Sequence, residues 1–350
     1  MSPWIFLRFL FLPALVIAGN LLGGWWNFSI PIVCFVIHPL VNLFSSQGSL
    51  HPEEHSETLR SDGNKTAYRF IPLLFVPVMI GLTVWAIIQS HTISTIEFTG
   101  LVLSVGMING ILGFTLAHEF IHRHSGIEKA AGQILLIQNS YPHYGIEHIG
   151  GHHVYACTPK DPHSARIGES FYRFLPRAIF LTLLNAWEIE SHRLIRKKFP
   201  VISRHNKMLQ LILFQFLLYV VINAAIGWKP LLFFIFQGVV AILILNITGY
   251  LQHYGLARKE IVEGRFEKIS AHHAWNSLQG KDGLNLFQVG KHADHHMHPS
   301  HPYEQLVQHH DSPEQPTGYS GMIWLALVPP LWFRVMDKRI HSFTTKKYSI

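Results

Sequence analysis

The sequence predicts an all-α membrane protein, in which six transmembrane helices support a cytoplasmic cap of helices and loops that carries a histidine-rich metal site. Three observations point to this fold class. Of 350 residues, 49% are hydrophobic and only 14% are charged, whereas soluble domains average about 25% charged residues. Six segments are apolar over the roughly 20 residues needed to span a bilayer. Histidine is abundant, with 25 residues, and much of it lies in three clusters beside these segments.

The six predicted spans form three helical hairpins joined by short turns. They cover Trp4–Leu22, Trp26–Phe44, Phe70–Ser90, Ile96–Ala117, Met208–Gly227 and Leu231–Leu251. Prolines interrupt the first two, and bilayer helices tolerate prolines when neighbouring groups satisfy the freed backbone. We expect residues 1–350 to form a single domain, with cytoplasmic metal-site regions at about 118–207 and 252–350.

Basic residues are distributed unequally between the two sides of these spans. The turns at Gly23–Gly24 and 89–95 contain no Lys or Arg, and the turn between the last two spans contains only Lys229. The long loops are rich in both, for example in the run Arg193–Lys198. Because Lys and Arg favour cytoplasmic loops, we expect a multi-pass protein of the bacterial inner (plasma) membrane with both termini and the metal site in the cytoplasm. The same sorting explains the net charge of +7, so nucleic acid is not an expected partner.

Two further segments are predicted to lie on the membrane surface. Phe171–Phe199 alternates aromatic and basic residues at helical spacing. Met322–Met336 is apolar but too short to span, and Pro329-Pro330 interrupts it. We expect Trp324 and Trp332 to anchor this second segment at the interface, where amphipathic aromatic rings are favoured.

The three histidine clusters are the strongest functional signal. Neutral imidazole is the commonest metal ligand, and helix residues spaced i, i+3 or i+4 share one face. Each cluster is therefore expected to direct two or three ring nitrogens to one place, and His253 leaves the last span on the same side. The nine candidate ligands are His118, His122, His148, His152, His153, His253, His292, His295 and His296.

Nine histidines are too many for one ion and suit two ions with four or five ligands each. Zinc, which is usually four-coordinate, fits this number poorly, so we expect two iron ions that activate O₂. A metal transporter would place ionisable residues in the middle of spans, whereas these lie at span ends. The two cysteines, Cys34 and Cys157, form no CxxC zinc motif, and Cys157 is expected to be a small packing residue.

Other polar residues next to the ligands are candidates to hold histidine N–H groups in the correct tautomer. They are the acidic residues Glu119, Glu147, Asp161 and Asp294, together with His272 and His273.

From about Trp25 to Arg339 the chain resembles the integral-membrane alkane 1-monooxygenases, within the fatty acid desaturase and hydroxylase superfamily. The resemblance includes the HxxxHH spacing of the second cluster and Gln252-His-Tyr-Gly-Leu256. Further motifs are Asn139-Ser-Tyr-Pro-His143, Ala156-Cys-Thr-Pro-Lys-Asp-Pro-His-Ser-Ala-Arg166, Gly168-Glu-Ser-Phe-Tyr-Arg173, Trp275-Asn-Ser277, Pro316-Thr-Gly-Tyr319, Pro329-Pro-Leu-Trp332 and Val335-Met-Asp337. The chain departs from the family pattern at Asn42, Ala274 and Gly290-Lys291, none of which is a candidate ligand.

The resemblance implies hydroxylation of the terminal carbon of alkanes, with O₂ and electrons from a rubredoxin that an NAD(P)H-dependent rubredoxin reductase serves. It also places Cys34 in the substrate tunnel, where a small side chain would admit long chains. Lys291 and the run Arg193–Lys198 are the expected docking sites for an acidic rubredoxin. The alternatives within the superfamily are an acyl desaturase and a hydroxylase of alkyl side chains on aromatic rings, as in xylene.

Overall fold

The computed structural model describes residues 2–40, 65–277 and 286–348. Their regular structure is helical apart from one short hairpin of β1 (Glu260–Val262) and β2 (Arg265–Phe266). The chain divides into two compact units. The first contains residues 1–37, 61–147 and 185–245, and the second contains 38–60, 148–184 and 246–350. Each unit is described below by itself.

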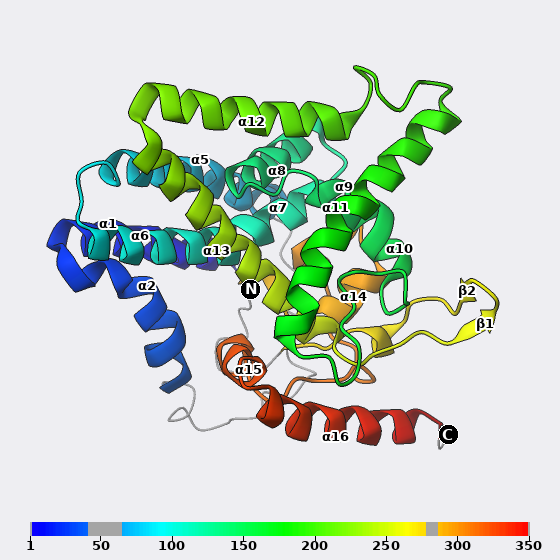
Figure 1. Cartoon of the computed structure of the whole chain (residues 1–350). Coiled ribbons are helices and arrows are strands. Elements are labelled where there is room, and N and C mark those ends of the chain that lie inside the picture. The colour runs from blue at the N-terminus through cyan, green and yellow to red at the C-terminus, as the bar shows by residue number, and fades with distance from the viewer. Residues whose placement is uncertain (1, 41–64, 278–285, 349–350) are drawn as a thin grey trace. The chain divides into compact units, whose positions relative to one another are not determined.

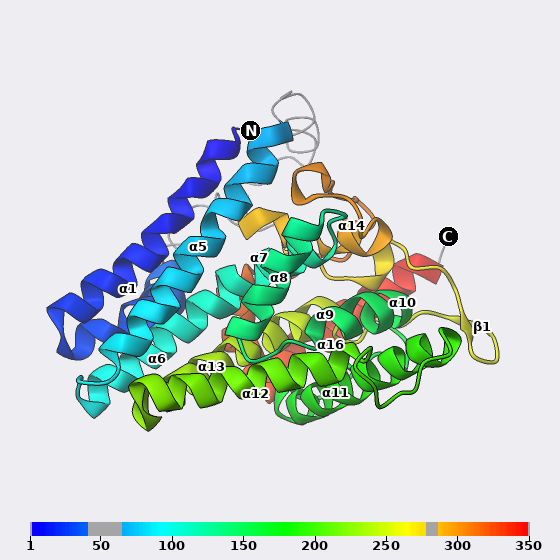
Figure 2. The same cartoon turned by 90° about the horizontal axis from the view of Figure 1, so that it is seen from above.

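The first unit is built mainly from long apolar helices (Figures 1 and 2). It begins with a 3-10 helix, Pro3–Leu10, that runs into α1 (Phe11–Leu22). The following helices are α2 (Ser29–Ile32), α5 (Lys65–Gln89), α6 (Thr95–Ile108), α7 (Phe114–Ile121), α8 (Gly126–Gln138), α9 (Tyr144–Glu147) and α12 (Lys207–Ile226). The unit also contains the first part of α13 (Trp228–His253) and the last part of α11 (Phe171–Arg196). Figure 2 shows α1, α5 and α6 side by side.

Five helices in the described residues are long and apolar enough to cross a membrane. They are Pro3–Leu22, Thr66–Gln89, Thr95–Ile121, Lys207–Ile226 and Trp228–His253, and each coincides with a predicted span. The predicted second span corresponds to a shorter apolar helical stretch, Gly24–Leu40. Its last four residues, 41–44, and Asn42 among them, lie outside the described part of the chain. The sequence therefore predicted a membrane protein correctly, while a complete sixth span stays a prediction.

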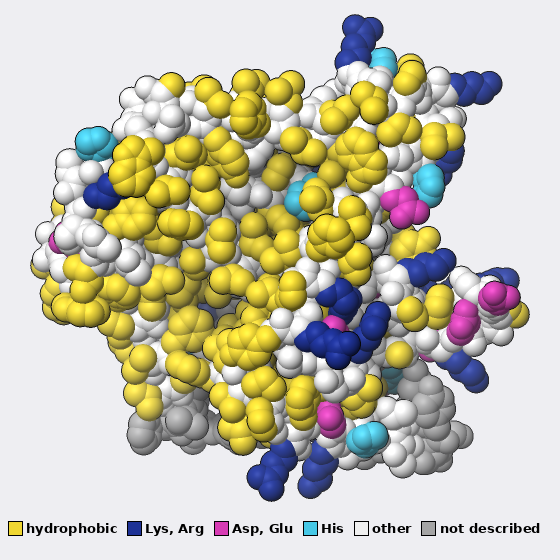
Figure 3. Space-filling model, in the orientation of Figure 1, with side chains coloured by type: hydrophobic (Ala, Val, Ile, Leu, Met, Phe, Trp, Pro, Cys, Tyr) yellow, Lys and Arg dark blue, Asp and Glu magenta, His cyan; other side chains and the backbone are white. Residues whose placement is uncertain are grey.

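The spanning helices of the first unit differ in how much of their surface is covered by protein. In Thr95–Ile121, 83% of an 18-residue apolar stretch is buried inside the protein. The corresponding stretch of α12 is only 11% buried. Apolar side chains on α12, such as Phe214 and Val221, are more than half exposed. Figure 3 shows such apolar side chains covering the region of α12 and α13. An exposed surface of this kind suits contact with lipid, because hydrocarbon tails replace the missing protein contacts.

The second unit packs its remaining helices around an aromatic core. These helices are α10 (His153–Tyr155), the start of α11, the end of α13, α14 (His292–Met297), α15 (Tyr319–Ala326) and α16 (Pro329–Tyr348). The core includes Phe174, Tyr250, Tyr254 and Trp275. Tyr250 and Tyr254 contact the Trp332 ring at centroid distances of 5.0 and 5.1 Å.

The role predicted for Trp332 is wrong. Its side chain is 0% exposed and lies in the core of the second unit, whereas Trp324 is 49% exposed. The break predicted at Pro329-Pro330 is confirmed, since α16 begins at Pro329 and α15 ends at Ala326. Proline suits the first turn of a helix, where its missing N–H is not needed. The new helix turns one face of the segment inward, and Trp332 lies on that face.

Candidate metal centre

Seven of the nine candidate ligands belong to the second unit, and they form two groups. His148, His153 and His295 make the first group, and His152, His253, His292 and His296 make the second. Within each group, the ligand atoms all lie within 4.8 Å of one another. Three segments far apart in the sequence supply them: residues 148–153, the end of α13, and α14.

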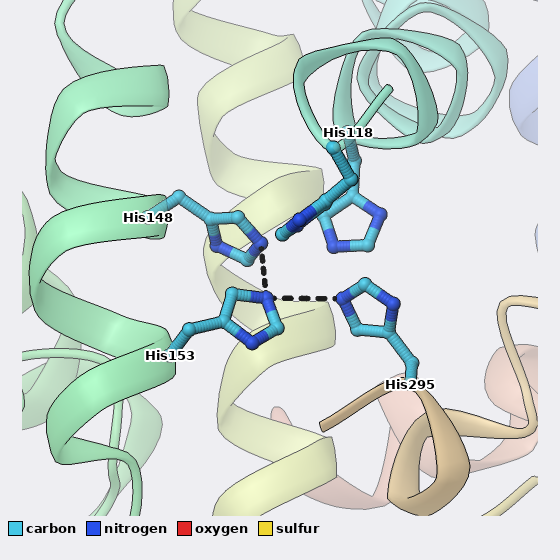
Figure 4. A group of neighbouring side chains, drawn as sticks. His118, His148, His153 and His295 are labelled. Carbon is cyan, nitrogen blue, oxygen red and sulfur yellow. Dashed lines mark hydrogen bonds between the residues drawn. The ribbon is translucent and has the colours of Figure 1, made fainter. Parts of the chain in front are cut away.

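The first group is arranged around His153 (Figure 4). Its Nε2 atom lies 3.0 Å from Nε2 of His148 and 3.1 Å from Nε2 of His295. Dashed lines in Figure 4 mark these two contacts, and the three rings direct their nitrogens toward one another. His148 is 2% exposed and His295 is 6% exposed.

A π-turn explains why His148 and His153 meet. Residues His148–His152 form a π-helix, followed directly by α10. A π-helix pairs residue i with residue i+5, instead of i with i+4 as in an α-helix. The turn therefore brings His153, five residues after His148, to the same place. The sequence predicted a common target for His148, His152 and His153, but the structure divides this cluster between the two groups.

The second group is more deeply buried and more compact. The Nε2 atoms of His253, His292 and His296 are separated from one another by 3.0, 3.1 and 3.2 Å. The ring of His152 lies 4.9 Å from that of His253 and 4.8 Å from that of His296, centroid to centroid. All four residues are buried. The group adjoins the first one, because the ring centroids of His153 and His296 are 4.7 Å apart.

Hydrogen bonds at Nδ1 orient two second-group histidines so that Nε2 faces the group. His152 Nδ1 donates to Asp161 Oδ2 at 3.0 Å, and His253 Nδ1 donates to the carbonyl oxygen of His273 at 3.3 Å. A neutral imidazole has one N–H, so Nε2 of each ring presents its lone pair to the group. The second-shell prediction is thus supported geometrically for Asp161. His273 also touches a ligand, but through its backbone carbonyl.

Burial and neighbouring groups favour a neutral His296 and an ionised Asp161. Burial and the neighbouring His292 lower the pKa of His296 well below its ordinary value. Burial alone would raise the pKa of Asp161, but the adjacent His152, His163 and His253 lower it well below its ordinary value. Neutral imidazole and carboxylate are the protonation states that bind a metal and orient its ligands.

Ser164, a residue outside the predicted set, completes the surroundings of Asp161. Ser164 Oγ donates to Asp161 Oδ2 at 2.6 Å and accepts the backbone N–H of Cys157 at 2.7 Å. The Cys157 thiol donates to the His273 carbonyl oxygen at 2.9 Å, and burial raises its pKa. Cys157 is therefore a buried packing residue, as predicted. Ser164 could have been inferred from its position three residues after Asp161, whereas the His273 carbonyl carries no sequence signal.

Two of the predicted second-shell residues do not contact the clustered histidines. In the described part of the chain, the His272 ring contacts Asp311 and Phe343. Asp294 Oδ1 accepts from His298 Nδ1 at 3.0 Å and from His309 Nε2 at 2.6 Å. The roles predicted for His272 and Asp294 stay predictions, and these contacts give them no support, since α14 directs its histidines to one side and Asp294 to the other. A carboxylate beside a ligand in sequence need not lie beside it in space.

The other two candidate ligands belong to the first unit. His118 and His122 are one turn apart at the end of α7, with ring centroids 5.1 Å apart. Glu119 pairs with Arg123 at 2.6 Å. Glu147 is 0% exposed at the end of α9. The roles predicted for Glu119 and Glu147 stay predictions.

The predicted docking residues differ in accessibility. Lys291 is 4% exposed, and its Nζ donates to the carbonyl oxygen of Leu306 at 2.9 Å. Burial lowers the pKa of this ammonium group to about 8. Lys291 is therefore not a surface docking residue, and that prediction is wrong. Arg196, Lys197 and Lys198 are exposed at the end of α11, where Figure 3 shows basic side chains projecting.

Comparison with known proteins identifies the relatives of this chain. The fatty acid desaturase family matches residues 95–326. Alkane 1-monooxygenase 1 of Pseudomonas aeruginosa is 39% identical over 323 residues, which cover 91% of this chain and 84% of that protein. Alkane 1-monooxygenase of Acinetobacter baylyi is 35% identical over 312 residues, covering 89% and 76%. The hydroxylase component of the xylene/toluene monooxygenase of Pseudomonas putida is 27% identical over 270 residues, covering 76% and 72%.

Proposed function

The chain belongs to the alkane 1-monooxygenase family, within the wider fatty acid desaturase family, and on this premise we propose that it hydroxylates the terminal carbon of alkanes at a site of two iron ions. In the proposed reaction, a terminal C–H bond becomes C–OH with one oxygen atom of O₂. The second oxygen atom leaves as water after taking up two electrons and two protons. The sequence resemblance implies the same reaction.

The observation that carries this proposal is the pair of adjoining histidine groups. The Nε2 atoms of His253, His292 and His296 are 3.0–3.2 Å apart. Nitrogens that bind one ion at right angles with bonds of about 2.1 Å are separated by about 3.0 Å, and in a tetrahedron by about 3.4 Å. The observed separations are short enough for the three nitrogens to bind one ion. At these distances the lone pairs of unprotonated Nε2 atoms would repel one another, and a bound cation would relieve that repulsion.

We propose that His118 and His122 are also iron ligands, which gives nine histidines for two ions. Their spacing of four residues on α7 puts both imidazoles on one face of the helix. An all-histidine site leaves the two ions with a high positive charge, since imidazole is neutral and the Asp161 carboxylate is hydrogen-bonded to His152 instead of binding an ion. Such a site differs from the carboxylate-rich sites of soluble di-iron bundles.

The chain's own contribution is to orient and bury the ligands. Two iron ions would supply O₂ activation. Asp161 and the His273 carbonyl hold His152 and His253 in the tautomer that frees Nε2. The burial of His292 and His296 keeps bulk water from the site, which strengthens electrostatic interactions there and limits side reactions.

The hydrocarbon substrate is proposed to enter from the bilayer, where it is already dissolved. Cys34 lies on the π-helix Val33–Ile37 and is half-buried. We propose that this residue borders the substrate tunnel. Since a dissolved alkane gains little by leaving lipid for protein, chain-length selectivity is expected to come from the shape of the tunnel.

We propose rubredoxin, served by an NAD(P)H-dependent rubredoxin reductase, as the electron donor. The exposed cations Arg196, Lys197 and Lys198 form a basic patch on the surface, suited to a small acidic protein. Arg193 contributes less, because it forms a bidentate ion pair with Glu190. This patch also belongs to the basic side of the predicted topology, which places both termini and the site in the cytoplasm, at the bacterial inner membrane.

A second candidate function is hydroxylation of an alkyl side chain on an aromatic ring. Its support is the similarity to the xylene/toluene monooxygenase component. An acyl desaturase is the third, supported by the family match. The three activities differ in their products: a primary alkanol, a benzylic alcohol and a new double bond.

The decisive experiment gives membranes containing the protein a homologous series of n-alkanes, xylene and a fatty acyl substrate, with a reducing system and O₂. The proposal requires 1-alkanols as the main products, and iron in the purified protein. Changing His296 to Ala should abolish turnover while the protein still inserts into membranes. The matched control is His272→Ala, because that ring contacts Asp311 instead of the clustered histidines. Zinc in place of iron, or full activity of His296→Ala, would refute the proposal.

A further inference from the structure

The helix that carries His118 and His122 is interrupted by a π-turn. It runs from Thr95 to Ile121 as α6, the π-helix Asn109–Gly113 and α7. The N–H of Phe114 donates to the carbonyl oxygen of Asn109, which is the i→i+5 bond of a π-turn. His118 lies on α7 and His122 directly follows it, nine and thirteen residues after Asn109.

A π-turn changes the direction in which all later side chains point. It accommodates one residue more than an α-turn, and each residue of an α-helix rotates by about 100°. If the turn closed to a regular α-helix, α7 would present its side chains about 100° away from their present direction. The imidazoles of His118 and His122 would then face a different neighbour.

An amide network ties this turn to three other helices of the first unit. The Asn109 side chain is 0% exposed. Its Nδ2 donates to Thr83 Oγ1 of α5 at 3.1 Å and to Gln237 Oε1 of α13 at 2.7 Å. Its Oδ1 accepts from Gln138 Nε2 of α8 at 2.9 Å. Gln237 Nε2 in turn donates to the Gln138 carbonyl oxygen at 2.9 Å. Both hydrogens and the oxygen of the Asn109 amide are therefore used.

Glycines on the same helix allow α13 to approach closely enough for these bonds. A Cβ atom at Gly106 would lie 2.6 Å from Cβ of Val240, and one at Gly110 would lie 2.6 Å from Cβ of Ile244. Gly106 and Gly110 are four residues apart, which is the spacing that lets membrane helices pack backbone to backbone. The hydrogen bonds of Asn109 are thus made across a tightly packed contact, where a misplaced amide would be left without a partner.

We propose that Asn109 is a positioning residue for the metal site: its amide network locks the π-turn and so fixes the direction in which His118 and His122 present their imidazoles. The inference rests on the proposed function, since it needs those two histidines to be iron ligands. The ligands of the second group, such as His292 and His296 on α14, lie on helices other than the one that the π-turn interrupts. Loss of the network should therefore affect one iron much more than the other.

The test is the iron content of purified Asn109→Leu, measured by mass spectrometry, with Mössbauer spectra to separate the two iron environments. Leucine has nearly the size of asparagine but forms no hydrogen bonds. We expect iron to fall from two per chain toward one, and turnover to fall by about tenfold or more, as for other changes in groups that orient ligands. The matched control is Ser104→Ala. Ser104 is also buried and hydrogen-bonded on this helix, with Oγ donating to Asn27 O at 2.6 Å, but it precedes the π-turn.

Two smaller changes decide the question if Asn109→Leu fails to insert. Thr83→Val and Gln237→Met each remove a partner of Asn109 and should each cause a partial, selective loss of one iron. Equal loss of both irons in these variants, or two irons and normal turnover in Asn109→Leu, would overturn the inference while leaving the proposed function intact. Wild-type protein without iron would overturn the proposed function, and this inference with it.

Discussion

The Nδ1 atom of His152 lies 3.0 Å from Oδ2 of Asp161, a carboxylate that is 2% exposed. The same oxygen accepts the hydroxyl of Ser164 at 2.6 Å, and Oδ1 accepts the backbone N–H of His163 at 3.0 Å. The carboxylate is therefore held on both oxygens and cannot rotate away from the imidazole. This pairing fixes both the tautomer and the ring orientation of His152, which is the usual role of a carboxylate behind a metal-binding histidine.

Changing Asp161 to Asn should weaken iron binding by about 10- to 100-fold. The amide keeps the size of the carboxylate but loses the charge that favours a proton on Nδ1 of His152. Iron affinity, measured by competition with a chelator, checks this. Asp311→Asn is the control, because Asp311 is 61% exposed and pairs with His272 away from the groups. Wild-type affinity in Asp161→Asn would show that the hydrogen bond is structural only.

Changing Trp332 to Ala should destabilise the protein by about 3–5 kcal/mol, as for other large aromatic residues removed from a core. Trp324→Ala should change stability by about 0.5 kcal/mol or less, because the Trp324 side chain is 49% exposed. Unfolding in detergent, followed by circular dichroism, measures both. Equal effects of the two changes would mean that Trp332 is an interfacial residue after all.

Reversing the charges of Arg196, Lys197 and Lys198 to Glu should lower turnover with rubredoxin by about tenfold, since electrostatic steering raises association rates by at least this factor. Turnover with a chemical reductant should be unaffected. In the wild-type protein, added salt should reproduce the loss as the Debye length shortens to about 8–10 Å. The control is Arg334→Glu, an exposed cation on α16. If turnover with rubredoxin is unchanged both by added salt and by charge reversal, the basic patch serves membrane topology alone.

Changing Cys34 to Trp should remove activity on long alkanes and preserve activity on short ones. The expectation follows from the proposed position of Cys34 beside the tunnel, where an indole would shorten the space available to the chain. Product analysis over a series of alkanes, compared with Cys34→Ser as a size-matched control, measures the shift. A uniform loss over all chain lengths, or no change, would exclude steric gating at this position.

The sequence alone determined the membrane helices and the kinds of ligand. Five predicted spans coincide with helices of the structure, because hydrophobicity over about 20 residues is a local property that needs no knowledge of tertiary contacts. The histidines were identifiable for the same reason, since their spacing and their position at span ends can be read directly from the sequence. Seven of them meet in the second unit.

Only the tertiary structure decided which histidines meet. His152 and His153 are neighbours in sequence but join different groups, while His295 separates from His292 and His296. Adjacent residues of an α-helix point about 100° apart. The π-turn at His148–His152 further changes the directions in which these side chains point. The same is true of Asp294, Lys291 and Trp332, whose surroundings come from segments distant in the chain. Side-chain direction and burial depend on packing between such segments, and a one-dimensional pattern does not contain that information.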